Sequence, residues 1–159
     1  MVLGIDPGRD KTGFAFVNSK DGNLIASGIF KTEDENFFSE FLDDKKVLDE
    51  KYFLEKKTDI EIKISDLEMI FIGNGTTSKN FFENNFLRKK IDVKIYEIDE
   101  KNTTLDARNL YWKIHKPGLL KSFLPMSMRV PSRKLDDLAA WAIALRGLKI
   151  YGYMLKDKL

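Results

Sequence analysis

The sequence predicts an α/β protein with a mixed five-stranded sheet covered by helices, in a single domain over residues 1–159. Three short apolar runs joined by tight turns fill residues 2–30, which indicates an antiparallel meander. Two further apolar runs, at residues 69–73 and 93–98, alternate with segments of helical periodicity. Antiparallel strands followed by alternating strands and helices are typical of a mixed sheet with helices on its faces.

The first three strands are expected at residues 2–6, 12–17 and 24–30. The first is apolar and ends in an acid, after which Pro7 and Gly8 turn the chain. The second is rich in aromatic and β-branched residues, which favour strands. An Asp-Gly pair at residues 21–22 is a hairpin signal before the third strand.

The middle of the chain alternates between helical and extended patterns. Residues 33–58 are charged, with Phe, Leu and Val at roughly helical spacing, and predict one long helix or two shorter ones. Residues 69–73 form a continuous apolar run typical of a buried strand. The Thr-Thr-Ser of residues 76–78 offers an N-cap for a helix that ends near residue 90. Residues 93–98 alternate, as a half-buried strand does.

Two more helices are expected in the last third. One spans residues 104–114 and ends before a Pro-Gly pair, and the other runs over residues 135–148 with a wide apolar face. Trp112 and Trp141 lie on these helices and are expected in the core. Residues 117–133 have no clear periodicity and predict an irregular loop.

Composition excludes several classes of protein. Cysteine is absent, so the chain has no disulfide framework and no thiolate metal site. The first residues lack a basic segment followed by an apolar run, and no apolar run approaches ~18 residues. We therefore expect a cytoplasmic protein without membrane contact. Residues 1–100 hold 15 Lys and Arg against 21 Asp and Glu, whereas residues 101–159 hold 12 against 4. A basic carboxy-terminal third suits a polyanionic partner such as nucleic acid, although two solvated faces would also explain it.

Acidic residues stand at the ends of three predicted elements. Asp6 ends the first strand, Asp99 and Glu100 follow the last strand, and Asp136 and Asp137 open the last helix. A carboxylate at the end of a buried strand is costly unless a cation neutralises it. Divalent cations such as Mg²⁺ prefer oxygen ligands, and two of them can stabilise both oxygens of an in-line phosphoryl displacement.

Each acid also has an ordinary structural explanation. Asp6 before Pro-Gly suits a turn, Asp136 suits an N-cap, and Asp99 and Glu100 suit an exposed loop. The metal-site hypothesis therefore depends on all three positions meeting at one edge of the sheet.

Several segments resemble the YqgF and RuvC-type nucleases of the RNase H-like superfamily. Residues 4–16, GIDPGRDKTGFAF, are similar to the first motif of both families, and residues 136–145, DDLAAWAIAL, to their closing Asp-rich helix. Residues 99–108, DEKNTTLDAR, resemble the YqgF pattern DERLTTxEAR. Residues 72–79 and 108–137 resemble further parts of a bacterial YqgF-like subgroup, whereas residues 33–66 resemble nothing identified.

This resemblance implies an RNase H-like nuclease with Mg²⁺ or Mn²⁺ as cofactor. Asp6, Glu100 and Asp137 would be catalytic and would bind the metal, with Asp136 as a further metal ligand. Asp99 and Asp136 are neighbours whose roles the resemblance does not separate.

Three departures from the families matter. Lys101 and Asn102 replace the YqgF Arg-Leu, and Lys101 keeps the charge without the bidentate geometry of Arg. Gly73 and Lys134 stand where RuvC resolvases carry acids. The YqgF-like interpretation is therefore favoured over that of a four-carboxylate resolvase.

Cations that flank these acids are candidates for contact with nucleic-acid phosphates. They are Arg9, Lys11, Lys101, Arg129, Arg133 and Lys134. The leading hypothesis is a metal-dependent nuclease acting on RNA, as in processing of ribosomal RNA precursors. The alternatives are a resolvase of branched DNA (Holliday junctions), which would act as a dimer, and a non-catalytic nucleic-acid-binding module. The sequence leaves monomer and homodimer open.

Overall fold

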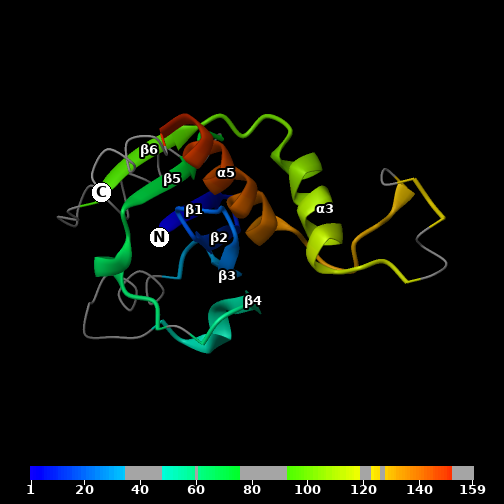
Figure 1. Cartoon of the computed structure of the whole chain (residues 1–159), viewed down its shortest axis with the longest axis horizontal. Coiled ribbons are helices and arrows are strands. Elements are labelled where there is room, and N and C mark those ends of the chain that lie inside the picture. The colour runs from blue at the N-terminus through cyan, green and yellow to red at the C-terminus, as the bar shows by residue number, and fades with distance from the viewer. Residues whose placement is uncertain (35–47, 60, 76–92, 119–122, 126–127, 152–159) are drawn as a thin grey trace.

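The computed structural model describes residues 1–34, 48–59, 61–75, 93–118, 123–125 and 128–151 (Figure 1). Its strands are β1 (Val2–Pro7), β2 (Lys11–Val17), β3 (Leu24–Lys31), β4 (Phe53–Lys56), β5 (Met69–Gly73) and β6 (Lys94–Ile98). Its helices are α3 (Thr103–Ile114) and α5 (Asp136–Tyr151), with short 3-10 helices η1 (Glu50–Tyr52) and η2 (Ile64–Asp66).

The strands form one mixed sheet in the order β4-β3-β2-β1-β5-β6. Neighbours from β4 to β1 are antiparallel, whereas β1, β5 and β6 run parallel to one another. The meander, the two later strands and both helices of the last third are confirmed. Parallel β1 and β5 place the carboxyl ends of these central strands at the same edge of the sheet.

The prediction for residues 33–58 is wrong where the structure describes them. Residues 50–56 form η1 and β4, so the sheet has six strands and not five. In β4 the partly or fully buried Phe53 and Glu55 alternate with exposed Leu54 and Lys56. This period of two is hidden in the sequence because a buried position carries an acid. Residues 35–47, and the helix expected after residue 76, lie outside the described residues.

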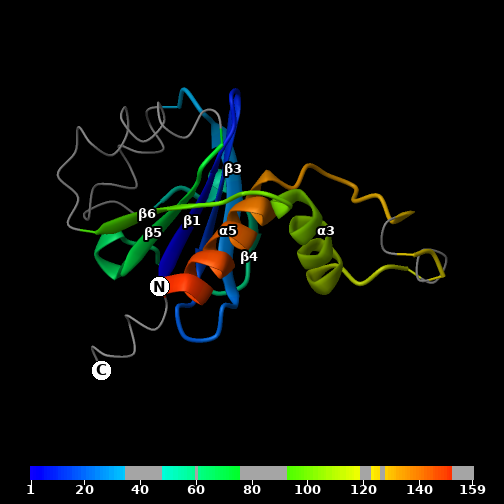
Figure 2. The ribbon, with the colours of Figure 1, turned by 90° about the horizontal axis from the view of Figure 1, so that it is seen from above.

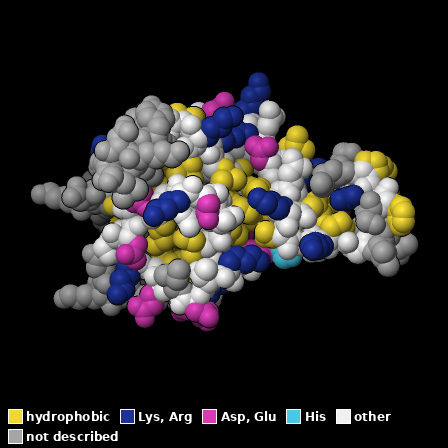
Figure 3. All heavy atoms as spheres, in the orientation of Figure 1, with side chains coloured by type: hydrophobic (Ala, Val, Ile, Leu, Met, Phe, Trp, Pro, Cys, Tyr) yellow, Lys and Arg dark blue, Asp and Glu magenta, His cyan; other side chains and the backbone are white. Residues whose placement is uncertain are grey.

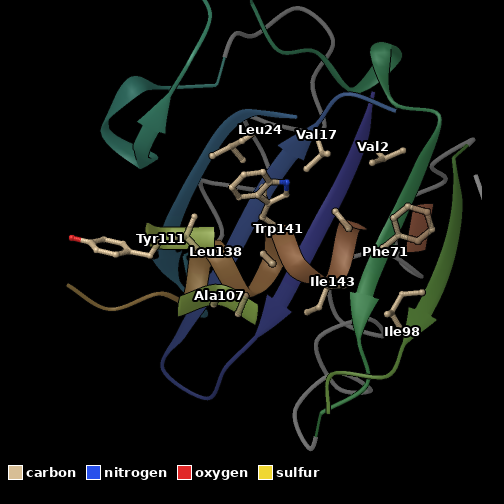
Figure 4. Packing of buried hydrophobic residues seen from close by; sticks show 14 of the residues in the cluster. Val2, Val17, Leu24, Phe71, Ile98, Ala107, Tyr111, Leu138, Trp141 and Ile143 are labelled. Atoms are coloured by element: carbon tan, nitrogen blue, oxygen red, sulfur yellow. The ribbon is translucent and has the colours of Figure 1, made fainter. Parts of the chain in front are cut away.

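Helix α5 covers one face of the sheet, and α3 packs beside it (Figures 1 and 2). Three side chains of α5 point toward the strands, namely Leu138, Trp141 and Ile143 (Figure 4). They pack among strand side chains that include Val2, Val17, Leu24 and Phe71. Trp112 and Trp141 are buried, as the sequence predicts. None of the helices that the structure describes is long and apolar enough to cross a membrane.

Two glycines let α5 approach the backbone of the central strands. A Cβ on Gly4 would collide with the Ala140 carbonyl, and one on Gly13 would collide with the Asp136 carbonyl. Gly4 lies in β1 and Gly13 in β2, so the two contacts fix the height and direction of the helix over these strands. The amino end of α5 is thereby held over the end of β1 that carries Asp6.

The opposite face of the sheet has a core of its own. It gathers Leu3, Ile5, Phe14, Phe16 and Ile70 with side chains from residues 48–67. Alternation along β1 thus sends Leu3 and Ile5 to this core, and leaves Asp6 on the face that carries α5.

We expect Gly4→Ala to lower the free energy of unfolding by about 2–3 kcal/mol, because the added methyl group meets helix backbone and not a flexible side chain. Gly118→Ala is the matched control, since a Cβ there meets nothing within 4 Å. Its effect should stay within about 0.5 kcal/mol. Urea denaturation of both variants checks the prediction, and equal stabilities would contradict the close approach of α5.

Candidate metal centre

Asp6 lies between two glycines in one row across the sheet. Its antiparallel partner is Gly13 in β2, and parallel pairing of Ile5 with Ile72 places Gly73 of β5 on its other side. Neither glycine has a side chain to fill the space beside the Asp6 carboxylate. On the β5 side the Glu100 carboxylate occupies this space, and on the β2 side the Asp136 backbone carbonyl does.

The carboxylate of Glu100 fills the space over the β5 side of this row. One of its oxygens lies 2.7 Å from where a Cβ of Gly73 would stand, and the other lies against the Cβ position of Gly75. Gly73 stands at the position where the RuvC resolvases carry an acid, so the sequence alone indicates that this acid is missing. In the structure the Glu100 carboxylate lies directly over that position, delivered by the next strand along the sheet.

The loop after β6 explains why Glu100, and not Asp99, faces the row. Asp99 is exposed, and its carboxylate accepts a hydrogen bond from the Lys101 N–H at 3.0 Å, which is a turn-forming role. Asn102 adopts a left-handed conformation with φ of 67°, which asparagine tolerates better than most residues. Thr103 then donates from both its hydroxyl and its N–H to the Glu100 carbonyl as α3 begins.

The two acids that open α5 have separate environments. The Asp136 carbonyl lies over Gly13, and its carboxylate acts electrostatically on Asp6. Asp137 is fully buried and accepts hydrogen bonds from Ser27 and from both terminal nitrogens of Arg133. Glu100 and Asp136 thus act electrostatically on Asp6, whereas the Asp137 carboxylate is engaged by Ser27 and Arg133.

Burial and two acidic neighbours raise the pKa of Asp6 from 3.8 to about 7. Burial is the largest cause, and the negative charges of Glu100 and Asp136 follow. Among the described residues no donor forms a hydrogen bond with the Asp6 carboxylate, and no Lys or Arg pairs with Asp6, Glu100 or Asp136. Among the described residues, Asp6 therefore lacks a positively charged partner that would offset this rise in its pKa.

This donor set fits a hard divalent cation in its chemistry. Carboxylate oxygens are the ligands that Mg²⁺ and Mn²⁺ prefer, and Mg²⁺ commonly uses only one or two of them beside water and phosphate oxygens. Among the described residues, no group of three or more His, Cys, Asp or Glu side chains lies close enough together to hold a metal ion.

Four of the six predicted phosphate-binding cations are exposed around the acids. Arg9 and Lys11 lie in and beside the turn between β1 and β2, Lys101 follows Glu100, and Lys134 precedes α5. Within the described part of the chain none of the four forms an ion pair with an acidic side chain. On the face shown in Figure 3, Lys and Arg side chains recur across the helices.

The other two cations are already engaged. Arg129 is partly buried and donates from Nε to the Leu124 carbonyl at 2.9 Å. Arg133 is bound to Asp137 and to Glu55. Glu55 and Ser27 could not be identified as partners from the sequence, because nothing in their local pattern distinguishes them from ordinary strand residues.

Comparison with known proteins supports the fold. No family model and no curated protein matches the sequence. Among solved structures, the chain is similar to that of RuvC from Thermus thermophilus, with a TM-score of 0.50 at 14% identity over 96% of this chain and 95% of that one. The fold is RuvC-like. The RNase H-like architecture expected from the sequence is thereby confirmed, whereas the closer resemblance to YqgF proteins stays a prediction.

Proposed function

We propose that the chain is a divalent-metal-dependent nuclease that hydrolyses phosphodiester bonds of nucleic acid. The observation that carries this proposal is the Asp6 carboxylate, which lies between Glu100 and Asp136 without a cationic partner among the described residues. Positive charge bound beside Asp6 would stabilise the ionised form of its carboxylate. The RuvC-like fold supports the proposal, because it presents the cluster at the carboxyl ends of the central parallel strands.

Asp136 replaces Asp137 in the proposed ligand set. The Asp137 carboxylate accepts three hydrogen bonds, two of them from a guanidinium at 2.6 and 3.1 Å. Binding a metal through Asp137 would require this ion pair to break inside the protein, which costs several kcal/mol. Asp136 has no such partner in the described structure and already acts on Asp6.

In this proposal the side chains of the protein bind the metal ion and orient the nucleic acid. Asp6 would be the central ligand, with Glu100 and Asp136 as the further carboxylates that hold the positive charge. A divalent cation bound there would supply charge stabilisation for the phosphoryl group and lower the pKa of the attacking water.

The exposed cations Arg9, Lys11, Lys101 and Lys134 would bind phosphates on either side of the scissile bond. Such contacts hold a strand in place without reading its sequence, and binding should weaken steeply with salt.

RNA is the proposed substrate, because DEKNTTLDAR at residues 99–108 resembles the YqgF pattern. Branched DNA is the second candidate, supported by the likeness of the fold to RuvC. The two differ in a measurable way, since resolution of a four-way junction requires paired cuts by a dimer.

The test is cleavage of structured RNA and of a four-way DNA junction by purified protein with Mn²⁺. We expect Asp6→Asn, Glu100→Gln and Asp136→Asn each to lower the rate by at least about 100-fold, since each removes charge that holds the metal. Asp99→Asn is the matched control, because its amide oxygen can still accept from the Lys101 N–H. This control should cut at the wild-type rate.

Equal cleavage by wild type and Asp6→Asn would assign the activity to a contaminant. Binding of nucleic acid without cleavage, unchanged by Mn²⁺, would instead show a non-catalytic binding module.

A further inference from the structure

Asp137 belongs to a network of charged groups that reaches from the first turn of α5 to the edge of the sheet. Its carboxylate accepts from Ser27 Oγ at 2.8 Å, from Arg133 Nη1 at 2.6 Å and from Arg133 Nη2 at 3.1 Å. Ser27 lies in β3 and is itself fully buried. The first turn of α5 is therefore joined to β3 by a hydrogen bond and to the preceding loop by a bidentate ion pair.

Arg133 extends the network to β4 and α3. Its Nη2 also donates to Glu55 Oε1 at 2.9 Å, and its guanidinium lies 5.8 Å from the centre of the Tyr111 ring. Glu55 in turn accepts from His115 Nε2 at 2.6 Å and from Lys57 at 3.2 Å. These hydrogen bonds lower the pKa of Glu55 although its burial acts to raise it, so Glu55 stays ionised beside Arg133.

The network fixes the orientation of the first turn of α5. Consecutive residues in an α-helix project about 100° apart, so the direction of Asp137 sets the direction of Asp136. The height of the same turn is set by the close approach of the Asp136 carbonyl to Gly13. With both fixed, the Asp136 backbone is held over Gly13, the cross-strand partner of Asp6, and its carboxylate stays near enough to act electrostatically on Asp6.

We propose that Asp137 is a positioning residue, which acts with Ser27, Arg133 and Glu55 to hold Asp136 beside Asp6 and Glu100. This inference rests on the proposed function, because it assigns Asp136 as the ligand that is positioned. It also removes Arg133 from the predicted phosphate-binding set. Groups that orient metal ligands typically alter metal affinity by ~10–100-fold when they are lost.

The experiment titrates the full-length protein with Mn²⁺ alone and follows binding by calorimetry. Asp137→Asn should bind Mn²⁺ with the wild-type stoichiometry and about tenfold weaker affinity. Asp136→Asn, which removes a ligand, should lose more affinity than Asp137→Asn. Arg133→Lys keeps one charge beside Asp137 without the bidentate geometry and should fall between wild type and Asp137→Asn.

A variant destabilised elsewhere separates positioning from general stability. Leu67→Ala removes a buried side chain from the core on the opposite face of the sheet, and should lower the melting temperature without changing Mn²⁺ affinity. If Asp137→Asn binds Mn²⁺ as tightly as wild type, the inference is overturned and the proposed function stands. If it binds as poorly as Asp136→Asn, Asp137 is itself a ligand and the inference is again overturned. Wild-type protein that does not bind Mn²⁺ would overturn the proposed function and the inference with it.

Discussion

The Asp6→Asn substitution is expected to stabilise the metal-free protein by about 3–4 kcal/mol near pH 8. Burial, Glu100 and Asp136 raise the pKa of Asp6 from 3.8 to about 7, so ionised Asp6 opposes folding. A neutral amide of the same shape removes this opposition. The same substitution that should abolish cleavage is thus expected to make the metal-free fold more stable, which is typical of a group held for function.

The pH dependence of this effect follows from the direction of the shift. Because the pKa of Asp6 is raised on folding, its favourable contribution is complete below about pH 4, where the folded and unfolded chains both hold the proton. It falls as pH rises through the interval from 3.8 to about 7, since the unfolded chain loses the proton first. Wild type and Asp6→Asn should therefore be equally stable at low pH and diverge as pH rises.

Urea denaturation in the presence of a chelator, from about pH 4 to about pH 8, measures this divergence. Asp99→Asn is the control, because Asp99 is exposed and its turn tolerates the amide. Its stability should follow that of wild type at every pH. A difference between wild type and Asp6→Asn that does not change with pH would show that Asp6 ionises normally in the fold.

Loss of Arg133 is expected to destabilise the protein by about 3–5 kcal/mol, because Arg133→Gln leaves the carboxylate of Asp137 buried without its charge partner. Asp137 is 0% exposed, so water cannot replace the guanidinium. Glu55 loses the same partner and, among the described residues, keeps its ion pairs with His115 and Lys57. An Arg that contacted phosphate from an exposed position would have little effect on stability when replaced.

Lys134→Gln is the matched control for this second prediction. Lys134 is the next residue, is exposed, and forms no ion pair within the described residues. Its replacement should change the free energy of unfolding by less than about 0.5 kcal/mol. Thermal and urea denaturation of the two variants, in buffer without nucleic acid, measures their stabilities. Equal stability of Arg133→Gln and Lys134→Gln would contradict the prediction.

Local patterns in the sequence predict most of the fold. Alternation and turn residues mark β1, β2 and β3, continuous apolar character marks β5, and the helical period marks α3 and α5. The strand β4 is missed because it is only 4 residues long and carries the buried acid Glu55, whose partners come from distant segments. Propensity and periodicity contain no information about such partners.

The sequence likewise predicts only part of the candidate site. Asp6 and Glu100 follow from the positions of acids at strand ends, and the parallel pairing of β1, β5 and β6 brings these ends to one edge of the sheet. The choice between Asp136 and Asp137 depends on how α5 is rotated over the sheet. That rotation is set by contacts of Gly13 and Arg133 that the sequence does not reveal.

The most direct test of the central claim is a crystal structure of the protein soaked in Mn²⁺, with the metal located by its anomalous scattering. We expect the metal beside the carboxylates of Asp6, Glu100 and Asp136, with Asp137 still bound to Arg133. A metal on Asp137 with Arg133 displaced would contradict this assignment of the ligands. Crystals that show no metal at the three carboxylates under saturating Mn²⁺ would contradict the metal centre itself.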